Sequence, residues 1–188
     1  MKSYKKVKAG SVLLSEPFMW DSNFKRSAIF ITDHNEKDGT VGFIMNKSID
    51  MTINELMADF PEFDCEVSFG GPVATDTIHY IHSIGHLLDD SIYVMDGVWW
   101  GGDFTQLKAL IRNGVIKQSD IRFFVGYSGW SKGQLREEMK TGSWVVADMD
   151  LNYIFNHREE ANLWQEIMEN KGDTFSVIGQ MPDGVNWN

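Results

Sequence analysis

A serine lies in a glycine-rich turn at residues 126–130, where the sequence reads Gly-Tyr-Ser-Gly-Trp. An apolar, strand-like run precedes this turn and a capped helix is expected after it, a setting that can hold a nucleophilic serine exposed. Such a turn needs G-x-S-x-G spacing so that small residues flank the serine, but the bulky Trp130 occupies the closing position. We therefore expect Ser128 to belong to a tight structural turn.

Three histidines, His79, His82 and His86, lie close together in the sequence and invite comparison with a zinc site. The local pattern is that of a strand, on which residues 79 and 82 point to opposite faces. No cysteine or carboxylate stands at tight ligand spacing beside them. We expect hydrogen-bonded histidines, with no metal and no cofactor.

The run Phe69-Gly70-Gly71-Pro72 follows another strand-like segment. Paired glycines there could turn backbone N–H groups towards an anion. Neither a phosphate-binding loop nor a dinucleotide motif accompanies them, so the nucleotide signal is weak. A turn required by tight packing is the favoured interpretation, and anion binding stays open as the alternative.

The elements that must position these residues are short strands and a few helices. Apolar and β-branched runs predict strands, and the Asp38-Gly39 pair predicts a turn between two antiparallel strands. Because strands and helices do not alternate regularly, the pattern favours a mixed α+β fold over a doubly wound sheet. The expected strands are residues 11–14, 28–32, 40–45, 66–69, 77–81, 91–95, 121–125 and 144–147.

Helices are predicted from capping boxes, in which a residue at the start and a Glu or Gln three positions later satisfy free backbone N–H groups. Four pairs fit this spacing. They are Thr52 with Glu55, before Pro61; Asp103 with Gln106, opening Phe104–Arg112; Ser131 with Gln134, ending near Gly142; and Asn156 with Glu159, opening His157–Asn170.

Composition limits the classes of protein that the chain can be. Its 188 residues are 43% hydrophobic, without a linker or repeat, which predicts one domain over residues 1–188. No apolar run reaches the roughly 20 residues of a membrane-spanning helix. The basic start is followed by too short an apolar segment for a signal peptide, and Cys65 is the only cysteine, so we expect a cytoplasmic protein without membrane association.

The chain is acidic. Seventeen Lys and Arg against 27 Asp and Glu give a net charge of −10, which disfavours nucleic acid as a direct partner. The one basic cluster, at Lys2, Lys5, Lys6 and Lys8, is interpreted as a solvated tail.

Short motifs follow one another in a fixed order along nearly the whole chain. Each alone is weak, and together they are specific. They are Gly10-Ser11-Val12-Leu13-Leu14, Pro17, Met19, Asp21, Phe24, Arg26, Ser27, His34, Gly39, Gly42-Phe43-Ile44-Met45-Asn46-Lys47, Gly70-Gly71-Pro72-Val73, His82, Gly126-Tyr127-Ser128-Gly129-Trp130, Gln134-Leu135 and Trp144. With them the chain closely resembles the AlgH/YqgE family of bacterial proteins, a group without a defined biochemical role.

The resemblance implies a complex, branched, mixed β-sheet that includes a small closed barrel and is flanked by helices. Family members are sometimes labelled transcriptional regulators, a label that this acidic chain without a helix-turn-helix motif does little to support. Two positions depart from the family pattern, with Ser48 in place of a common proline and Ser128 in place of a common alanine. If relatives lack the hydroxyl at residue 128, a serine nucleophile cannot be a shared mechanism.

Two functional hypotheses remain. The preferred one is a non-enzymatic binding or regulatory protein for an unknown protein partner or a small anionic ligand, because no complete catalytic or metal set is readable. Its alternative is an undiscovered hydrolase or transferase acting on a small anionic substrate, with His34 as general base. The family-like residues proposed for binding are Arg26, His34, Asn46, Lys47, Gly70 and Gly71.

Overall fold

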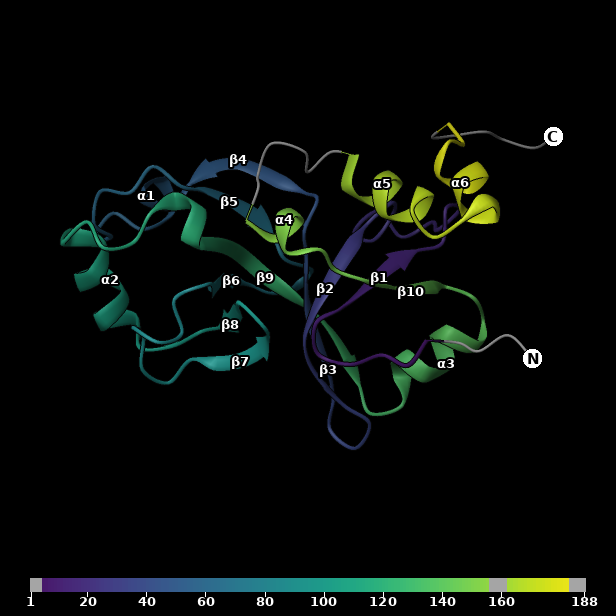
Figure 1. Ribbon diagram of the computed structural model, residues 1–188, viewed down its shortest axis with the longest axis horizontal. Coiled ribbons are helices and arrows are strands. Elements are labelled where there is room, and N and C mark those ends of the chain that lie inside the picture. Colours follow the sequence, from purple (N-terminus) through teal and green to yellow (C-terminus); the bar gives the residue numbers. More distant parts are fainter. Residues whose placement is uncertain (1–4, 156–161, 183–188) are drawn as a thin grey trace.

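The structure is a computed structural model that describes residues 5–155 and 162–182 (Figure 1). Within these residues ten strands form a single connected set of ladders. The strands are β1 (Ser11–Ser15), β2 (Ala28–Asn35), β3 (Gly39–Ile44), β4 (Ser48–Thr52), β5 (Glu66–Phe69), β6 (Val73–His82), β7 (Ile92–Met95), β8 (Val98–Trp100), β9 (Ile121–Ser131) and β10 (Trp144–Asp148).

Short helices complete the α+β fold. In the described residues no helix is long and apolar enough to cross a bilayer. The helices are α1 (Ile53–Leu56), α2 (Phe104–Arg112), the 3-10 turn η1 (Gln118–Asp120), α3 (Gln134–Lys140), α4 (Leu151–Ile154), α5 (Leu163–Glu169) and α6 (Asp173–Gly179).

Two of the expected helix starts are confirmed. Thr52 donates its backbone N–H to the Glu55 carboxylate over 2.7 Å, which completes the capping box of α1. Asp103 accepts the N–H of Gln106 over 2.7 Å and caps α2.

The other two expected starts have different outcomes. At the third, β9 extends through Ser131, so α3 begins only at Gln134 and is capped by Gly133 in the left-handed conformation. The fourth expected start, at Asn156, lies outside the described residues, and α5 begins at Leu163.

All eight expected strands are present, and β4 and β8 were missed. β4 is largely exposed and lacks an apolar run, and β8 has only three residues. That residues 1–188 form one domain stays a prediction.

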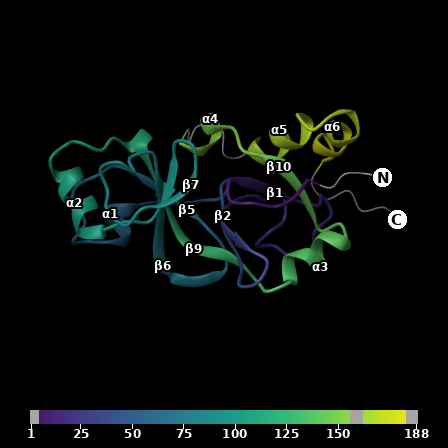
Figure 2. The ribbon, with the colours of Figure 1, turned by 60° about the horizontal axis from the view of Figure 1, so that its bottom comes forward.

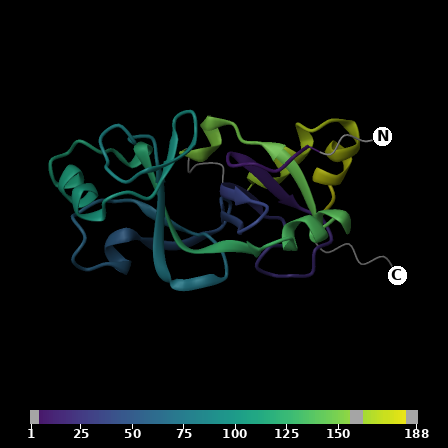
Figure 3. The same cartoon turned by 90° about the horizontal axis from the view of Figure 1, so that it is seen from below.

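The sheet branches at β9. Its main path runs β10-β1-β2-β3-β9-β6-β8-β7, and β9 also pairs in parallel with β5, which in turn pairs with β4. β6 pairs with β9 between residues 121 and 127, β5 pairs with residues 123–125, and β3 pairs with the last four residues of β9. Figures 1 and 3 show β9 running from the part of the sheet beside α1 and α2 towards α3.

The sheet is open. A barrel closes only when hydrogen bonds join its first and last strands. Among the described residues β10 pairs only with β1, and β7 only with β8, so the two ends of the path are not joined. The small closed barrel implied by the resemblance is therefore not supported.

Helices cover both faces of the β10-β1-β2-β3 region. Alternate residues of these strands point to opposite faces, so each strand contributes to two cores. On one face Leu14 and Phe30 share a cluster with Trp164 of α5, and on the other Leu13 and Ile29 share one with Leu135 of α3. Figure 2 shows α5 and α6 on one side of β1 and β10 and α3 on the other, with α1 and α2 at the far end of the molecule.

The branch is held by hydrogen bonds and by close packing between backbone groups. The Gly70 N–H donates to the Val125 carbonyl over 2.8 Å, and its carbonyl accepts the N–H of Ile44 and the hydroxyl of Ser128. A Cβ atom on Gly70 would lie 2.3 Å from the carbonyl oxygen of Gly126. The glycine is required because no side chain fits there.

Arg122 provides a second link at the branch. Its guanidinium is fully buried and donates to the carbonyls of Met45 and Ile154 and to the Ser68 hydroxyl. Met45 follows β3, Ser68 lies in β5 and Ile154 is the last residue of α4. One side chain of β9 therefore links segments that are distant in sequence.

The substitution Gly70→Ala should lower the free energy of unfolding by at least about 2 kcal/mol, because overpacking against fixed backbone cannot relax. Urea unfolding followed by circular dichroism measures this change. Gly129→Ala is the matched control in the neighbouring motif, since its Cβ would meet side chains instead of backbone, the Tyr127 ring at 3.1 Å and Val73 at 3.9 Å. Equal effects of the two substitutions would contradict the packing argument.

His82 makes the stability of the fold depend on pH. The ring is fully buried, with Nδ1 accepting the N–H of Ile84 and Nε2 2.7 Å from the Gly101 carbonyl, so it is neutral. Burial lowers the pKa of His82, and the hydrogen bond to Gly101 opposes that shift. Because the unfolded chain then binds the proton first, the stabilisation is complete above the unfolded pKa of about 6.5 and is lost as the pH falls below it.

Unfolding measured between pH 7.5 and 5 should therefore show wild-type stability falling relative to His82→Gln, which has no titrating ring at this position. His86→Gln, at an exposed position, should retain the wild-type pH dependence. An unchanged pH dependence in His82→Gln would show that another group is responsible.

Candidate functional site

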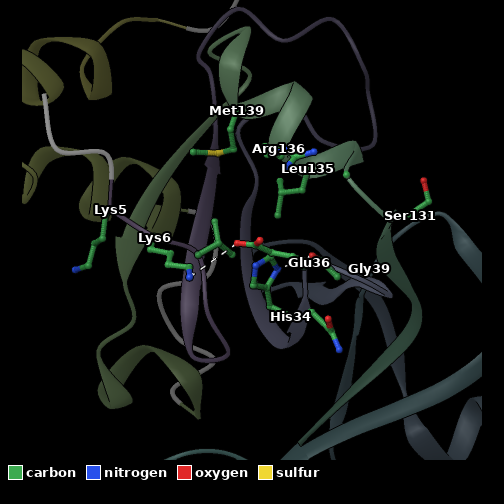
Figure 4. A pocket seen from close by; sticks show the side chains of 13 residues that line it. Lys5, Lys6, His34, Glu36, Gly39, Ser131, Leu135, Arg136 and Met139 are labelled. Atoms are coloured by element: carbon green, nitrogen blue, oxygen red, sulfur yellow. Dashed lines mark hydrogen bonds and ion pairs between the residues drawn. The ribbon is translucent and has the colours of Figure 1, made fainter. Parts of the chain in front are cut away.

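A cavity of about 260 Å³ lies where the N-terminal segment, the β2–β3 hairpin and the start of α3 meet (Figure 4). The hairpin turn is built locally, because Asn35 accepts the N–H of Lys37 and donates its side-chain amide to Asp38. The expected turn at Asp38-Gly39 is thus confirmed. It places His34 and Thr40 opposite each other on adjacent strands.

His34, Thr40 and Trp130 form a row across three strands. His34 pairs with Thr40, and Thr40 pairs with Trp130, so all three side chains point to the face that α3 covers. The Nδ1 atom of His34 lies 2.7 Å from the Thr40 hydroxyl oxygen. This contact fixes the half-buried imidazole as a polar wall of the cavity.

α3 is fixed against the same face by one carboxylate. Glu138 accepts the indole N–H groups of Trp130, over 2.9 Å, and Trp144, over 2.7 Å. Charge-assisted bonds of this kind are stronger than neutral ones. They set the side of α3 that faces the cavity.

The interior of the cavity is apolar. Val7 of the N-terminal segment and Leu135 of α3 are both buried, and Met139 lies one turn further along α3. Figure 4 shows Leu135 pointing into the space between His34 and Lys6. The floor can therefore receive a hydrocarbon or aromatic group.

The rim of the cavity is charged and exposed. The Lys6 ammonium lies 3.9 Å from the Glu36 carboxylate, with 86% and 67% of the two side chains exposed. Arg136 stands on α3 at the same rim and pairs with Glu137 over 3.8 Å. Exposed pairs of this kind contribute at most about 1 kcal/mol, so a ligand can replace either carboxylate at little cost.

Lys5 also lines the cavity, but its ammonium pairs with Asp148 and points away from the centre in Figure 4. The lysine run that sequence patterning assigned to a solvated tail thus contributes to a cavity wall. Only the clustering of lysines at the start of the chain signalled this role. Arg136 carried no signal, because its position depends on how α3 packs.

Of the six residues proposed for binding, Asn46 joins Arg26 at the start of β2. Asn46 accepts the N–H of Ala28 over 2.9 Å and donates to the carbonyl of Arg26 over 2.8 Å. The Arg26 guanidinium donates to the Met181 carbonyl and lies 4.8 Å from the centre of the Trp164 ring.

Lys47 reaches the same loop. Its ammonium donates to the carbonyls of Ser22 and Asn23, over 3.0 and 2.6 Å. Burial lowers the pKa of Lys47, while Asp21 raises it. Lys47 and Asn46 together hold the loop before β2 in place.

His34 does not lie with these residues. Six residues of extended strand separate Ala28 from His34, which is about 20 Å. Gly70 and Gly71 lie at the branch instead, where Gly71 has a φ of 152° and a Cβ would lie 2.3 Å from Tyr127 backbone atoms. The packing interpretation of this glycine pair accounts for these contacts, and ligand binding by all six residues stays a prediction.

The other candidate groups are engaged in packing. Ser128 is fully buried and donates to the Gly70 carbonyl over 3.0 Å, so its hydroxyl is not exposed as a nucleophile. Burial raises the pKa of the Cys65 thiol to about 12, which keeps it protonated. In the described part of the chain no three His, Cys, Asp or Glu side chains gather as a metal site.

Known proteins are similar to this chain over most of its length. Residues 12–176 match the AlgH-like family model. A UPF0301 protein of Chlorobaculum parvum is 38% identical over 97% of this chain and 98% of its own length, and one from Chlorobaculum tepidum is 40% identical over 96% of each chain. The names of these relatives state no activity.

Two solved structures have the same fold. A protein of Corynebacterium diphtheriae superposes with a TM-score of 0.76 at 19% identity over 95% of each chain. The solution structure of the AlgH protein from Pseudomonas aeruginosa gives 0.72 at 22% identity, over 98% of this chain and all of the other. The chain therefore belongs to the AlgH-like family.

Proposed function

We propose that this AlgH-like chain is a non-enzymatic binding or regulatory protein that recognises a small anionic ligand in the cavity beside His34. One observation carries the proposal. Three cations, Lys5, Lys6 and Arg136, line the cavity against one carboxylate, Glu36; with Lys5 paired to Asp148, the remaining lining charges give 2 − 1 = +1 in a chain whose net charge is −10. A local positive field in an acidic protein concentrates anions at that point.

Binding explains the cavity better than catalysis does. A general base needs a partner group that it can deprotonate in a substrate or a nucleophile. Two hydroxyls line the cavity. Thr40, 2.7 Å from His34, is buried, and Ser131 donates to Gln134 over 3.3 Å with its side chain pointing away from His34 (Figure 4). A hydrolase or transferase in which His34 acts directly on a bound anionic substrate remains the alternative.

The regulatory role in this proposal follows from ligand binding rather than from contact with DNA. The net charge of −10 opposes a phosphate backbone, and Lys5 and Lys6 are engaged beside the cavity. We also propose a cytoplasmic location. A buried, free Cys65 supports it, because the fold makes no use of a disulfide.

Thermal unfolding at low salt tests the proposal with inorganic phosphate, acetate and citrate as probes. A bound anion at about 100 times its dissociation constant should stabilise the chain by about 2.7 kcal/mol, or roughly 5–10 °C in Tm. Lys6→Ala and Arg136→Ala should each abolish most of the shift, because each removes a rim cation.

Lys8→Ala and Lys132→Ala are matched controls, since both lysines are exposed neighbours that do not line the cavity. They should keep the wild-type shift. A shift that survives in all four variants would place the anion elsewhere, and the absence of any shift would favour a protein partner.

A further inference from the structure

The cavity has an apolar interior and a charged mouth. Its interior is formed by Val7, Leu135 and Met139, whereas its charged groups, Lys6, Arg136 and Glu36, are at the mouth. A compact polar anion would contact only the mouth and would leave the apolar interior uncovered. Burial of apolar surface is the main source of affinity in pockets of this kind.

We propose that the ligand is an amphipathic monoanion, with an acyl or alkyl group inside the cavity and its anionic head between Lys6 and Arg136. The inference rests on the proposed function and names the class of ligand for that site. His34 and Thr40 form the polar wall between the two regions, so they are placed to orient the atoms next to the head.

The charges at the mouth select a single negative charge. The Lys5 ammonium is turned away and paired with Asp148, which leaves Lys6 and Arg136 against Glu36 among the lining charges. Their sum is 2 − 1 = +1. A dianionic head would meet the Glu36 carboxylate, which already lies 3.9 Å from the Lys6 ammonium.

The volume limits the length of the apolar group. At about 30 Å³ for a group the size of a water molecule, 260 Å³ accommodates about eight or nine such groups. Each methylene buried should raise the affinity about threefold to fourfold. The gain should therefore continue to a chain of about eight carbons and then stop.

Isothermal titration of the full chain with linear carboxylates of four, six, eight and ten carbons tests the proposal. The affinity should rise about tenfold for each pair of carbons up to eight and level off at ten. The alcohols of the same lengths should bind at least tenfold more weakly, because they lack the charge. Hexyl phosphate compares binding of a phosphate head with binding of a carboxylate head. Its titration at pH 5 and at pH 8 compares the affinity of the phosphate monoanion with that of the dianion.

Two variants make the test independent of folding damage. Glu36→Gln should bind octanoate about twofold to fivefold more tightly, because it removes the carboxylate that competes for Lys6. Met139→Gln should flatten the dependence on chain length while preserving the affinity for butanoate. Met51→Gln, at an exposed methionine outside the cavity, is its control.

The outcomes separate the two proposals. Anion binding that ignores chain length, or alcohols that bind as well as carboxylates, would overturn the amphipathic ligand. The first result would leave the proposed anion-binding function in place. No binding of any carboxylate or phosphate would overturn both, and weaker binding by Glu36→Gln would refute the arrangement of charges at the mouth.

Discussion

Close contact between two backbone segments is the constraint on which this fold depends. Gly70 and Gly71 press against the backbone of Gly126 and Tyr127, where an added Cβ would lie only 2.3 Å from carbonyl atoms. At this contact β9 passes from pairing with β5, which ends at Val125, to pairing with β3, which begins at Ser128. Gly126 adopts a φ of 64°, which glycine tolerates without strain. The two glycine motifs that suggested chemistry in the sequence are thus the two sides of one structural junction.

The two parts of β9 on either side of that junction pack in different cores. The first half of the strand packs against α1 and α2 and carries Arg122, whose buried guanidinium links segments from three parts of the chain. The last residues carry Trp130 into the core under α3. Since Glu138 ties α3 to Trp130, the position of the cavity follows from the course of β9.

Most local features follow from the sequence, with β4, β8 and the start of α3 as exceptions, whereas long-range contacts do not. The eight strands, the capping pairs at Thr52 and Asp103 and the turn at Asp38-Gly39 depend on neighbouring residues, so pattern alone predicts them. Contacts between segments distant in sequence bring Asn46 to the start of β2, about 20 Å along that strand from His34. No local pattern could reveal that Lys6 and a helix residue share the mouth of a cavity, or that the sheet stays open.

One wall of that cavity is the segment before β1 rather than a strand. Residues 5–7 precede β1 and are held at the rim by exposed ion pairs, while the opposite walls belong to the sheet and to a helix fixed by two indoles. Local opening of such a segment needs far less free energy than global unfolding. Entry and exit of a ligand would then be timed by fraying of this segment, so the residence time would be set by a few surface charges while the sheet remains rigid.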